Sequence, residues 1–215
     1  MPIHWVTFDC YGTLIDWERG ITDALLPLLP ERIEREELAR RYIATEAKVE
    51  AESYRPYRDV LGEAGRRVLA AFGSVAPSPL PASLARWRPF AEVPSALAEL
   101  RRRGRKIAIL SNVDRDLIAS SLPQLKLEPD LVVTAQDCGS YKPAPGHWRM
   151  FAERSGAGPA DTIHVGASQY HDMRPAAALG YRAVFVDRHG EKLETTPKRV
   201  IPDLAVLPDV IDALE

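Results

Sequence analysis

The 215-residue chain has few cysteines, no long apolar run and almost no net charge. Its two cysteines, Cys10 and Cys138, cannot build a disulfide framework, and they form no CxxC or Cys/His metal-binding spacing. No stretch approaches the length of a membrane span, and the sequence begins with a β-forming segment rather than with a basic and apolar signal. These absences lead us to expect a protein of the reducing cytoplasm.

The balance of charged and apolar residues is that of an ordinary globular protein. Thirty acidic side chains nearly cancel 28 basic ones, so nothing indicates a bulk attraction to nucleic acid or to a membrane surface. Hydrophobic residues make up 46% of the chain and charged residues 27%, which is enough to bury one core or a core with a smaller insertion. We expect a small-molecule substrate as the partner, and a monomer or a homodimer.

Short β-forming segments alternate with helical segments through most of the chain. The predicted strands are 3–8, 106–110, 131–134, 162–165, 183–186 and a short last one at 204–207. The helices predicted between and after them are 95–103, 114–121, 146–155 and 172–179. This alternation predicts an α/β fold with a Rossmann-like, doubly wound parallel sheet.

A long helical segment interrupts this pattern after the first strand. Apolar residues recur at helical spacing between residues 17 and 72, and a proline-rich connector follows at 77–81. We therefore expect a core domain made of residues 1–15 and 91–215. Residues 16–90 would form a helical cap above the ends of the core strands.

Polar side chains follow four of the predicted strands or lie in the loops after them. They are Asp9, the pair Ser111 and Asn112, Lys142, and the loop from Ser168 to Asp172. Because the carboxyl ends of parallel strands meet at one edge of a sheet, where ligands bind, we expect these residues to converge. The sequence therefore predicts one site at this edge, beneath the cap.

Each of these residues also has a purely structural interpretation. Asp9 could form a turn, Lys142 could be a solvated surface charge, and Ser111 and Asn112 could cap a helix. Asp172 could be a first-turn acid that the helix dipole favours. Their convergence nevertheless favours Asp9 as a carboxylate nucleophile, with Lys142 as the cation that keeps it ionised and stabilises transition-state charge.

Taken in order, four segments resemble the motifs of the haloacid dehalogenase superfamily. They are residues 8–16 (FDCYGTLID), residues 110–112 (LSN), Lys142 with Pro143, and residues 166–172 (GASQYHD). The resemblance covers the whole chain and implies a Rossmann-like core with a helical cap. Within the superfamily, the Asp-x-Tyr-Gly-Thr form is similar to the type II 2-haloacid dehalogenases.

The resemblance implies a two-step reaction without a cofactor or a metal. Asp9 would displace the halide from C2 of a 2-haloacid, and water activated by Asp172 would then hydrolyse the ester to a 2-hydroxy acid. Lys142 would stabilise the Asp9 carboxylate and the oxyanion, while Thr13 and Ser168 would add hydrogen bonds around them.

The resemblance also assigns residues to substrate binding. Ser111 and Asn112 would hold the substrate carboxylate, and Arg41, on the cap, would lie near the leaving halide. Tyr11 is a nonacidic residue where phosphatases carry a general acid, and a departing halide needs no proton. Trp148 stands where the family has a tyrosine, six residues after the lysine.

Two other functions stay open. A phosphatase of the same superfamily would bind Mg²⁺ through Asp9 and Asp172 and act on a small phosphoester, but Tyr11 and Ala167 replace the acids that phosphatases carry in the first and last motifs. Gln169 also departs from the dehalogenase pattern. A homologue that binds a ligand without turnover is the second alternative.

Overall fold

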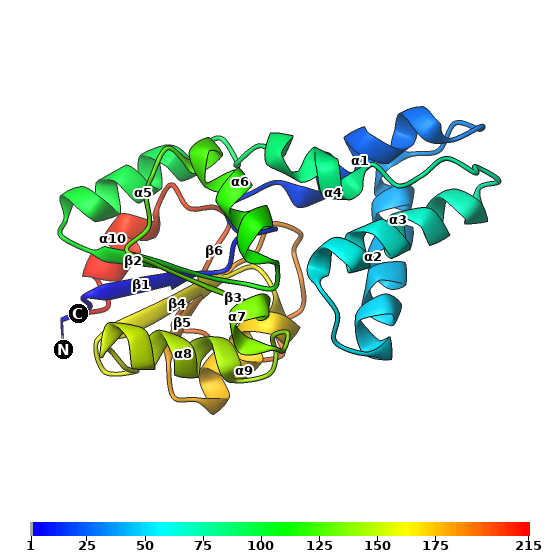
Figure 1. Ribbon diagram of the computed structural model, residues 1–215. Helices are drawn as coiled ribbons and strands as arrows, with labels where there is room; N and C mark the ends of the chain where they lie inside the picture. Colours follow the sequence, from blue (N-terminus) through cyan, green and yellow to red (C-terminus); the bar gives the residue numbers. More distant parts are fainter. Residues whose placement is uncertain (1) are drawn as a thin grey trace.

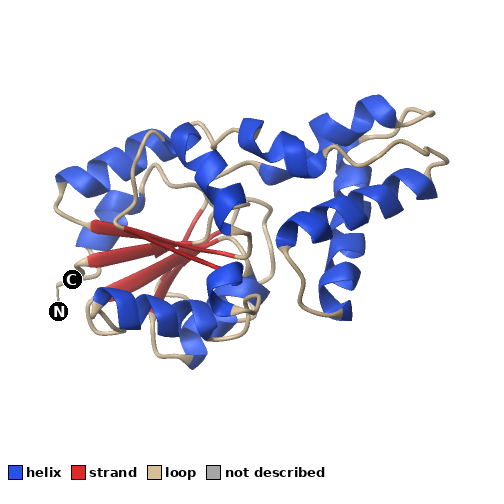
Figure 2. Ribbon diagram, in the orientation of Figure 1, coloured by secondary structure: helices blue, strands red, loops and turns tan. Residues whose placement is uncertain are grey.

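Six parallel strands form a single sheet in the computed structural model, which describes residues 2–215 (Figures 1 and 2). The strands are β1 (Trp5–Phe8), β2 (Lys106–Ser111), β3 (Leu131–Thr134), β4 (Thr162–Gly166), β5 (Arg182–Val186) and β6 (Arg199–Ile201). In their order, β3-β2-β1-β4-β5-β6, the first strand lies at the centre. From it the chain adds β2 and β3 on one side of the sheet and β4, β5 and β6 on the other. This is the predicted fold class, and its switch point lies at the carboxyl end of β1.

Helices cover both faces of the sheet. The upper face in Figure 1 carries α5 (Val93–Arg102), α6 (Arg115–Leu125) and α10 (Leu207–Asp212). The lower face carries α7 (Ala135–Cys138), α8 (Gly146–Ser155) and α9 (Arg174–Ala178). Alternate residues of each strand serve these two layers: Ile107 and Ile109 join one hydrophobic cluster, and Ala108 and Leu110 join the other.

The segment between β1 and β2 forms a helical lobe beyond the carboxyl ends of the strands (Figure 1). Its elements are α1 (Trp17–Leu25), η1 (Leu26–Leu28), α2 (Arg35–Glu52), α3 (Tyr57–Ala71), α4 (Leu80–Ser83) and η2 (Leu84–Arg86). The chain enters and leaves this lobe through adjacent segments, because Ile15 forms a bridge with Pro89 and the Asp16 amide donates to the Arg88 carbonyl at 2.9 Å. The helical insertion after the first strand is thus confirmed.

The predicted strand at residues 204–207 is wrong. The sixth strand is Arg199–Ile201, and Pro202 follows it directly. Leu204 and Leu207 are fully buried, but they lie in the turn before α10 and in its first residue. A short apolar run has no periodicity that separates a strand from the start of a buried helix, so the sequence pattern was ambiguous here.

The predicted helix at 172–179 is divided in the structure. A π-helical turn, η3 (Gln169–Met173), precedes α9 and carries Asp172.

Among residues 2–215, no helix combines the length and the apolar composition that crossing a membrane requires.

Candidate active site

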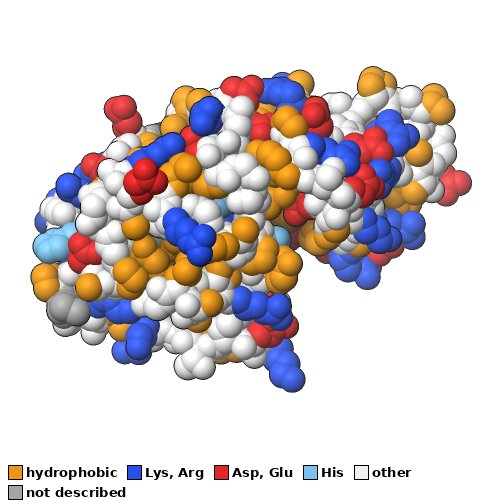
Figure 3. All heavy atoms as spheres, turned by 60° about the horizontal axis from the view of Figure 1, so that its bottom comes forward, with side chains coloured by type: hydrophobic (Ala, Val, Ile, Leu, Met, Phe, Trp, Pro, Cys, Tyr) orange, Lys and Arg blue, Asp and Glu red, His pale blue; other side chains and the backbone are white. Residues whose placement is uncertain are grey.

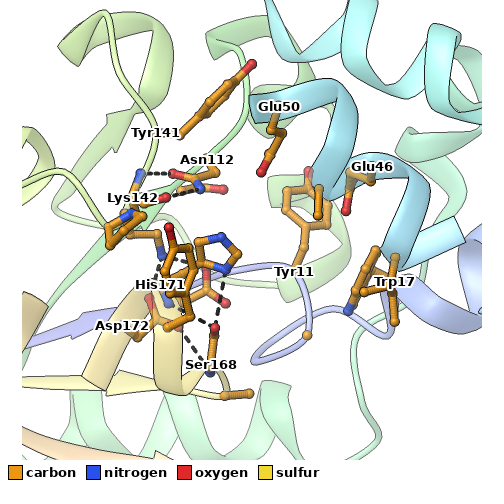
Figure 4. Close-up of a pocket in the computed structure, with 18 of the residues that line it drawn as sticks. Tyr11, Trp17, Glu46, Glu50, Asn112, Tyr141, Lys142, Ser168, His171 and Asp172 are labelled. Carbon is orange, nitrogen blue, oxygen red and sulfur yellow. Dashed lines mark hydrogen bonds and ion pairs between the residues drawn. The ribbon is translucent and has the colours of Figure 1, made fainter. Parts of the chain in front are cut away.

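A cavity of about 820 Å³ lies between the strand ends and the inner side of the cap (Figure 4). The core forms one wall of this cavity, and the cap forms the wall that faces it. We call core wall the cavity-lining residues that follow the strands: Asp9, Tyr11, Ser111, Asn112, Tyr141, Lys142, Ser168, His171 and Asp172. We call cap wall the lining residues of α1, α2 and α3: Trp17, Glu18, Ile43, Glu46, Ala47, Glu50, Ala51 and Tyr57.

Lys142 joins two carboxylates at the bottom of the cavity. Its Nζ donates to Asp9 Oδ1 at 2.8 Å and to Asp172 Oδ1 at 2.7 Å. The side chains of Lys142 and Asp172 are 1% and 0% exposed, whereas that of Asp9 is 14% exposed. The three residues come from three separate loops, which the parallel sheet brings together as the sequence led us to expect. Asp9 is the member that a ligand can reach most readily.

A turn after β1 orients the Asp9 carboxylate. Gly12 has φ +96°, a conformation that favours glycine, and the chain then returns so that Thr13 Oγ1 donates to Asp9 Oδ2 at 2.8 Å. The same hydroxyl accepts from the Ala167 amide at 2.9 Å. Each oxygen of Asp9 therefore has one donor, and each keeps a lone pair.

Burial and charge act in opposite directions on the three groups. Burial lowers the pKa of the Lys142 ammonium, but Asp172 and Asp9 outweigh this effect and raise it to about 12. Burial would raise the pKa of Asp172, yet Lys142 and His164 hold it well below its usual range. For Asp9, burial outweighs Lys142, and the charge of Asp172 adds to the rise, so its pKa lies above its usual value. The ammonium therefore stays charged at neutral pH, and Asp172 stays ionised.

Two residues that sequence reasoning missed hold Asp172 in place. His164, in β4, is fully buried; its Nε2 lies 3.3 Å from Asp172 Oδ1, and its Nδ1 lies 2.9 Å from the Thr7 hydroxyl. Gly166 lets the carboxylate approach the strand, because a Cβ there would lie 2.6 Å from Asp172 Cγ. The only sequence signal for His164 is a polar residue within an otherwise apolar strand.

Ser111 and Asn112 differ in the hydrogen bonds that their side chains form. Asn112 Oδ1 accepts from the Lys142 amide at 2.6 Å, and its Nδ2 donates to the Lys142 carbonyl at 3.1 Å, so it fixes the backbone of the lysine. Ser111 Oγ, in contrast, is buried without a hydrogen-bond partner among residues 2–215. Ser111 is among the residues that line the cavity, and its hydroxyl is buried just behind the cavity surface.

Tyr11 contributes a ring rather than an acid. Its hydroxyl is hydrogen-bonded to Ser121 Oγ at 2.8 Å, on α6, and burial raises the pKa of the phenol well above 10. Ser168 caps the π-helical turn: its Oγ accepts from the His171 amide at 3.0 Å. His171 lines the cavity, although the sequence offered no reason to select it, and burial lowers its pKa.

Two residues assigned from the resemblance lie outside the cavity. Arg41 donates to Glu37 at 2.6 Å, and its guanidinium lies 4.9 Å from the centre of the Phe72 ring. The face of α2 that lines the cavity carries Ile43 and residues three, four and seven positions later, and a residue two positions before Ile43 points elsewhere. The expected placement of Arg41 beside a leaving group is therefore wrong.

Trp148 is the second of these residues. It is 1% exposed, belongs to the hydrophobic cluster on the lower face of the sheet, and packs edge-on against the His164 ring at 5.2 Å. Its assignment to substrate binding is wrong in this structure, because α8 turns it into the core rather than into the cavity.

The core wall is a poor fit to a divalent cation. Mg²⁺ prefers an octahedral shell of oxygen ligands. Here Asp9 and Asp172 both accept from the Lys142 ammonium, and Ala167 offers no side-chain oxygen. Residues 2–215 contain no group of three or more His, Cys, Asp or Glu side chains that could hold a metal ion.

Comparisons with known proteins agree on the family and divide on the reaction. Haloacetate dehalogenase H-2 of Moraxella sp. (strain B) is 30% identical over 122 residues, which are 54% of this chain and 54% of that protein. Phosphoserine phosphatase of Thermus thermophilus is 35% identical over 123 residues, which are 55% of this chain and 49% of that protein. These alignments span about half the length of the relatives, so they carry no conclusion about the whole protein's substrate.

A solved structure extends the likeness to the whole fold. L-2-haloacid dehalogenase from Xanthobacter autotrophicus, with chloropropionic acid covalently bound, has a TM-score of 0.88 and 22% identity, covering 99% of this chain and 100% of that chain. At this identity the likeness shows the fold alone. The family model of the haloacid dehalogenase-like hydrolases matches residues 3–180. The chain therefore belongs to the haloacid dehalogenase-like hydrolases.

Proposed function

We propose that this protein is a metal-independent 2-haloacid dehalogenase. The observation that carries the proposal is the pairing of one buried ammonium with two carboxylates, one of which faces the cavity. One oxygen of each carboxylate accepts from the Lys142 ammonium, which supplies the positive charge at the bottom of the cavity. The Tyr11 hydroxyl, bound to Ser121, is not free to protonate a leaving group, which favours a leaving group that needs no proton.

The first step forms an ester. An oxygen of Asp9 attacks C2 of the substrate, the C2–halogen bond breaks, and the halide leaves with the bonding electrons. The Ser111 hydroxyl, which has no hydrogen-bond partner among residues 2–215, would donate to the substrate carboxylate. Thr13 and Lys142 each hold one oxygen of the nucleophile, so attack requires little reorganisation.

The second step restores the enzyme. Water adds to the carbonyl carbon of the ester, the bond from that carbon to the substrate oxygen breaks, and a 2-hydroxy acid leaves. The water gives one proton to the ionised Asp172, which passes it to the departing oxygen. The second proton of the water is left on the Asp9 carboxyl group and is released to solvent, so both carboxylates are restored. Lys142 stabilises the negative charge that develops during this step.

An isotope experiment tests the covalent route. In a single turnover in heavy-oxygen water, we expect the label on Asp9 and none in the first product molecule, since the hydroxyl oxygen of that product comes from Asp9. Asp9→Asn should abolish activity, and Asp172→Asn should accumulate an ester detectable as a mass increase on the intact chain. Label that appears in the first product would contradict the ester.

A release panel separates this proposal from the phosphatase alternative. The relatives include both reactions, so halide and phosphate release should be measured on 2-chloro-, 2-bromo- and 2-fluoro-acids and on small phosphomonoesters, with EDTA and with Mg²⁺. Halide release that survives EDTA supports the dehalogenase. Phosphate release that EDTA abolishes supports the phosphatase.

A further inference from the structure

Two glutamates of α2 project into the cavity from the cap wall. Figure 4 shows Glu46 and Glu50 extending from the helix into the space between Tyr141, Tyr11 and Trp17. They follow Ile43 by three and seven residues, so all three lie on one face of the helix. The glutamates lie opposite the core wall, across the volume that a ligand must occupy to reach Asp9.

The carboxylates of these two glutamates are incompletely paired. Glu46 Oε1 accepts from the Tyr57 hydroxyl at 2.5 Å and from the Tyr42 hydroxyl at 3.2 Å, which fixes its orientation. Its Oε2 has no hydrogen-bond partner among residues 2–215, and within the same residues Glu50 has neither a hydrogen-bond nor an ion-pair partner. Glu46 Oε2 and the carboxylate oxygens of Glu50 can therefore accept hydrogen bonds from a ligand that carries donors.

Within the part of the chain that the structure describes, no free cation faces the two glutamates. Among residues 2–215, no arginine lines the cavity, and the Lys142 ammonium is held by Asp9 and Asp172. His171 has a lowered pKa and is neutral at pH 7, and His189 lies 3.4 Å from Glu18. Consistent with missing partners, burial raises the pKa of Glu46 to about 7 and that of Glu50 to about 8.

Aromatic rings surround the same space. Tyr11, Trp17, Tyr57 and Tyr141 all line the cavity, and the rings of Tyr57 and Tyr141 meet edge-on at 6.3 Å. Aromatic faces attract organic cations, and carboxylates add direct ion pairs. The volume of about 820 Å³ also far exceeds what a two- or three-carbon acid fills, so a ligand bound at Asp9 can extend to the cap wall.

We propose that Glu46 and Glu50 bind an ammonium group at the far end of the substrate, and that the preferred substrate is a zwitterion. This inference rests on the proposed function for the reacting end, which is a 2-halocarboxylate held at the core wall. An aliphatic chain would connect that end to an ammonium group between the two glutamates and the surrounding rings. The positive charge of the ammonium would favour the ionised forms of both glutamates, whereas a far end without that charge would leave them largely protonated and form no ion pair.

A matched pair of substrates tests the preference. We expect wild-type protein to show a kcat/KM about tenfold or more higher for 6-amino-2-chlorohexanoate than for 2-chlorohexanoate, because only the first carries the ammonium. The double variant Glu46→Gln/Glu50→Gln keeps the shape and the tyrosine hydrogen bonds and should lose this preference. Glu36→Gln, which removes the same charge from an exposed position of α2, should keep it. Equal ratios in the wild type and the double variant would overturn the proposal.

A binding measurement separates this proposal from the proposed function. If no halide is released from either compound, the dehalogenase assignment fails, and titration calorimetry with hexylammonium and with 1-hexanol decides the ammonium site by itself. Wild-type protein should bind hexylammonium at least about tenfold more tightly than the alcohol, and the double variant should bind both alike. Equal affinities in the wild type would overturn the site.

Discussion

The two walls of the cavity differ in how completely their charged groups are paired. On the core wall, Lys142 bridges Asp9 and Asp172, Thr13 donates to the other oxygen of Asp9, and the Ser168 amide donates to the other oxygen of Asp172. On the cap wall, Glu50 has no partner among the described residues. The paired charges of the core wall are already oriented for a reaction before a ligand arrives. The unpaired carboxylate of the cap wall can instead be paired by a group of the ligand.

The outer surface of the cap sharpens this contrast. Figure 3 shows acidic and basic side chains intermixed over the cap lobe, and the ion pairs there are local: Glu37 with Arg40 and Arg41, and Glu63 with Arg66. Glu37 and Glu63 have arginines three or four residues away along the helix, but Glu46 and Glu50 do not. Glu46 and Glu50 thus lack the local ion pairs that Glu37 and Glu63 form on the outer face.

Removing Lys142 should have the largest effect on the core wall. Lys142→Met fills a similar volume without the charge, and it leaves Asp9 and Asp172 facing each other. We expect kcat to fall by about 10³-fold or more, because both the orientation of the nucleophile and the stabilisation of developing charge are lost. Halide release under saturating substrate measures this directly.

The stability of the same variant should depend on pH. Without the ammonium, the folded-state pKa values of the two buried carboxyls rise above their unfolded values near 4. The folded state then binds more protons, so the melting temperature should fall, relative to wild type, as pH rises from 5 to 8. Lys48→Met, at an exposed cap position, is the control. Activity within tenfold of wild type would contradict the role given to Lys142.

The core wall could be predicted from sequence because its residues follow strands. A parallel sheet brings the carboxyl ends of its strands to one edge, so the order Asp9, Asn112, Lys142 and Asp172 was enough to predict a cluster. The partners within the cluster could not be predicted. That Asn112 would bind the lysine backbone, and that His164 would face Asp172, depends on side-chain directions that become fixed only when the helices pack.

The cap wall escaped sequence analysis for a geometric reason. Successive side chains of a helix are rotated by about 100° around its axis, so two residues that are two positions apart lie on nearly opposite faces of the helix. The resemblance pointed to Arg41, while the face that lines the cavity carries Ile43, Glu46 and Glu50. The composition of α2, rich in charge on all sides, gave no apolar stripe strong enough to orient it.

Gly166→Ala should produce a smaller effect on the core wall. The added Cβ would lie 2.6 Å from Asp172 Cγ, so the carboxylate must move away from Lys142 and the bound ester. We expect kcat to fall by about 10²-fold, with the hydrolytic step slowed more than ester formation. Quenched-flow mass measurement of the ester distinguishes the two steps. Gly158→Ala is the matched control, since a Cβ there meets nothing within 4 Å, and an equal loss in both variants would contradict the account.

The smallest expected effect concerns the cap wall without a ligand. Burial, aided by Glu46, raises the pKa of Glu50 from 4.5 to about 8. The folded state therefore holds a proton that the unfolded chain has lost, and wild-type stability should decline as pH rises from about 4.5 to 8. Glu50→Gln removes this decline, so its melting temperature should equal that of wild type at pH 5 and exceed it by roughly 3–6 °C at pH 9. A difference that does not change with pH would mean that Glu50 already has a partner in the free protein, and the contrast between the two walls would then disappear.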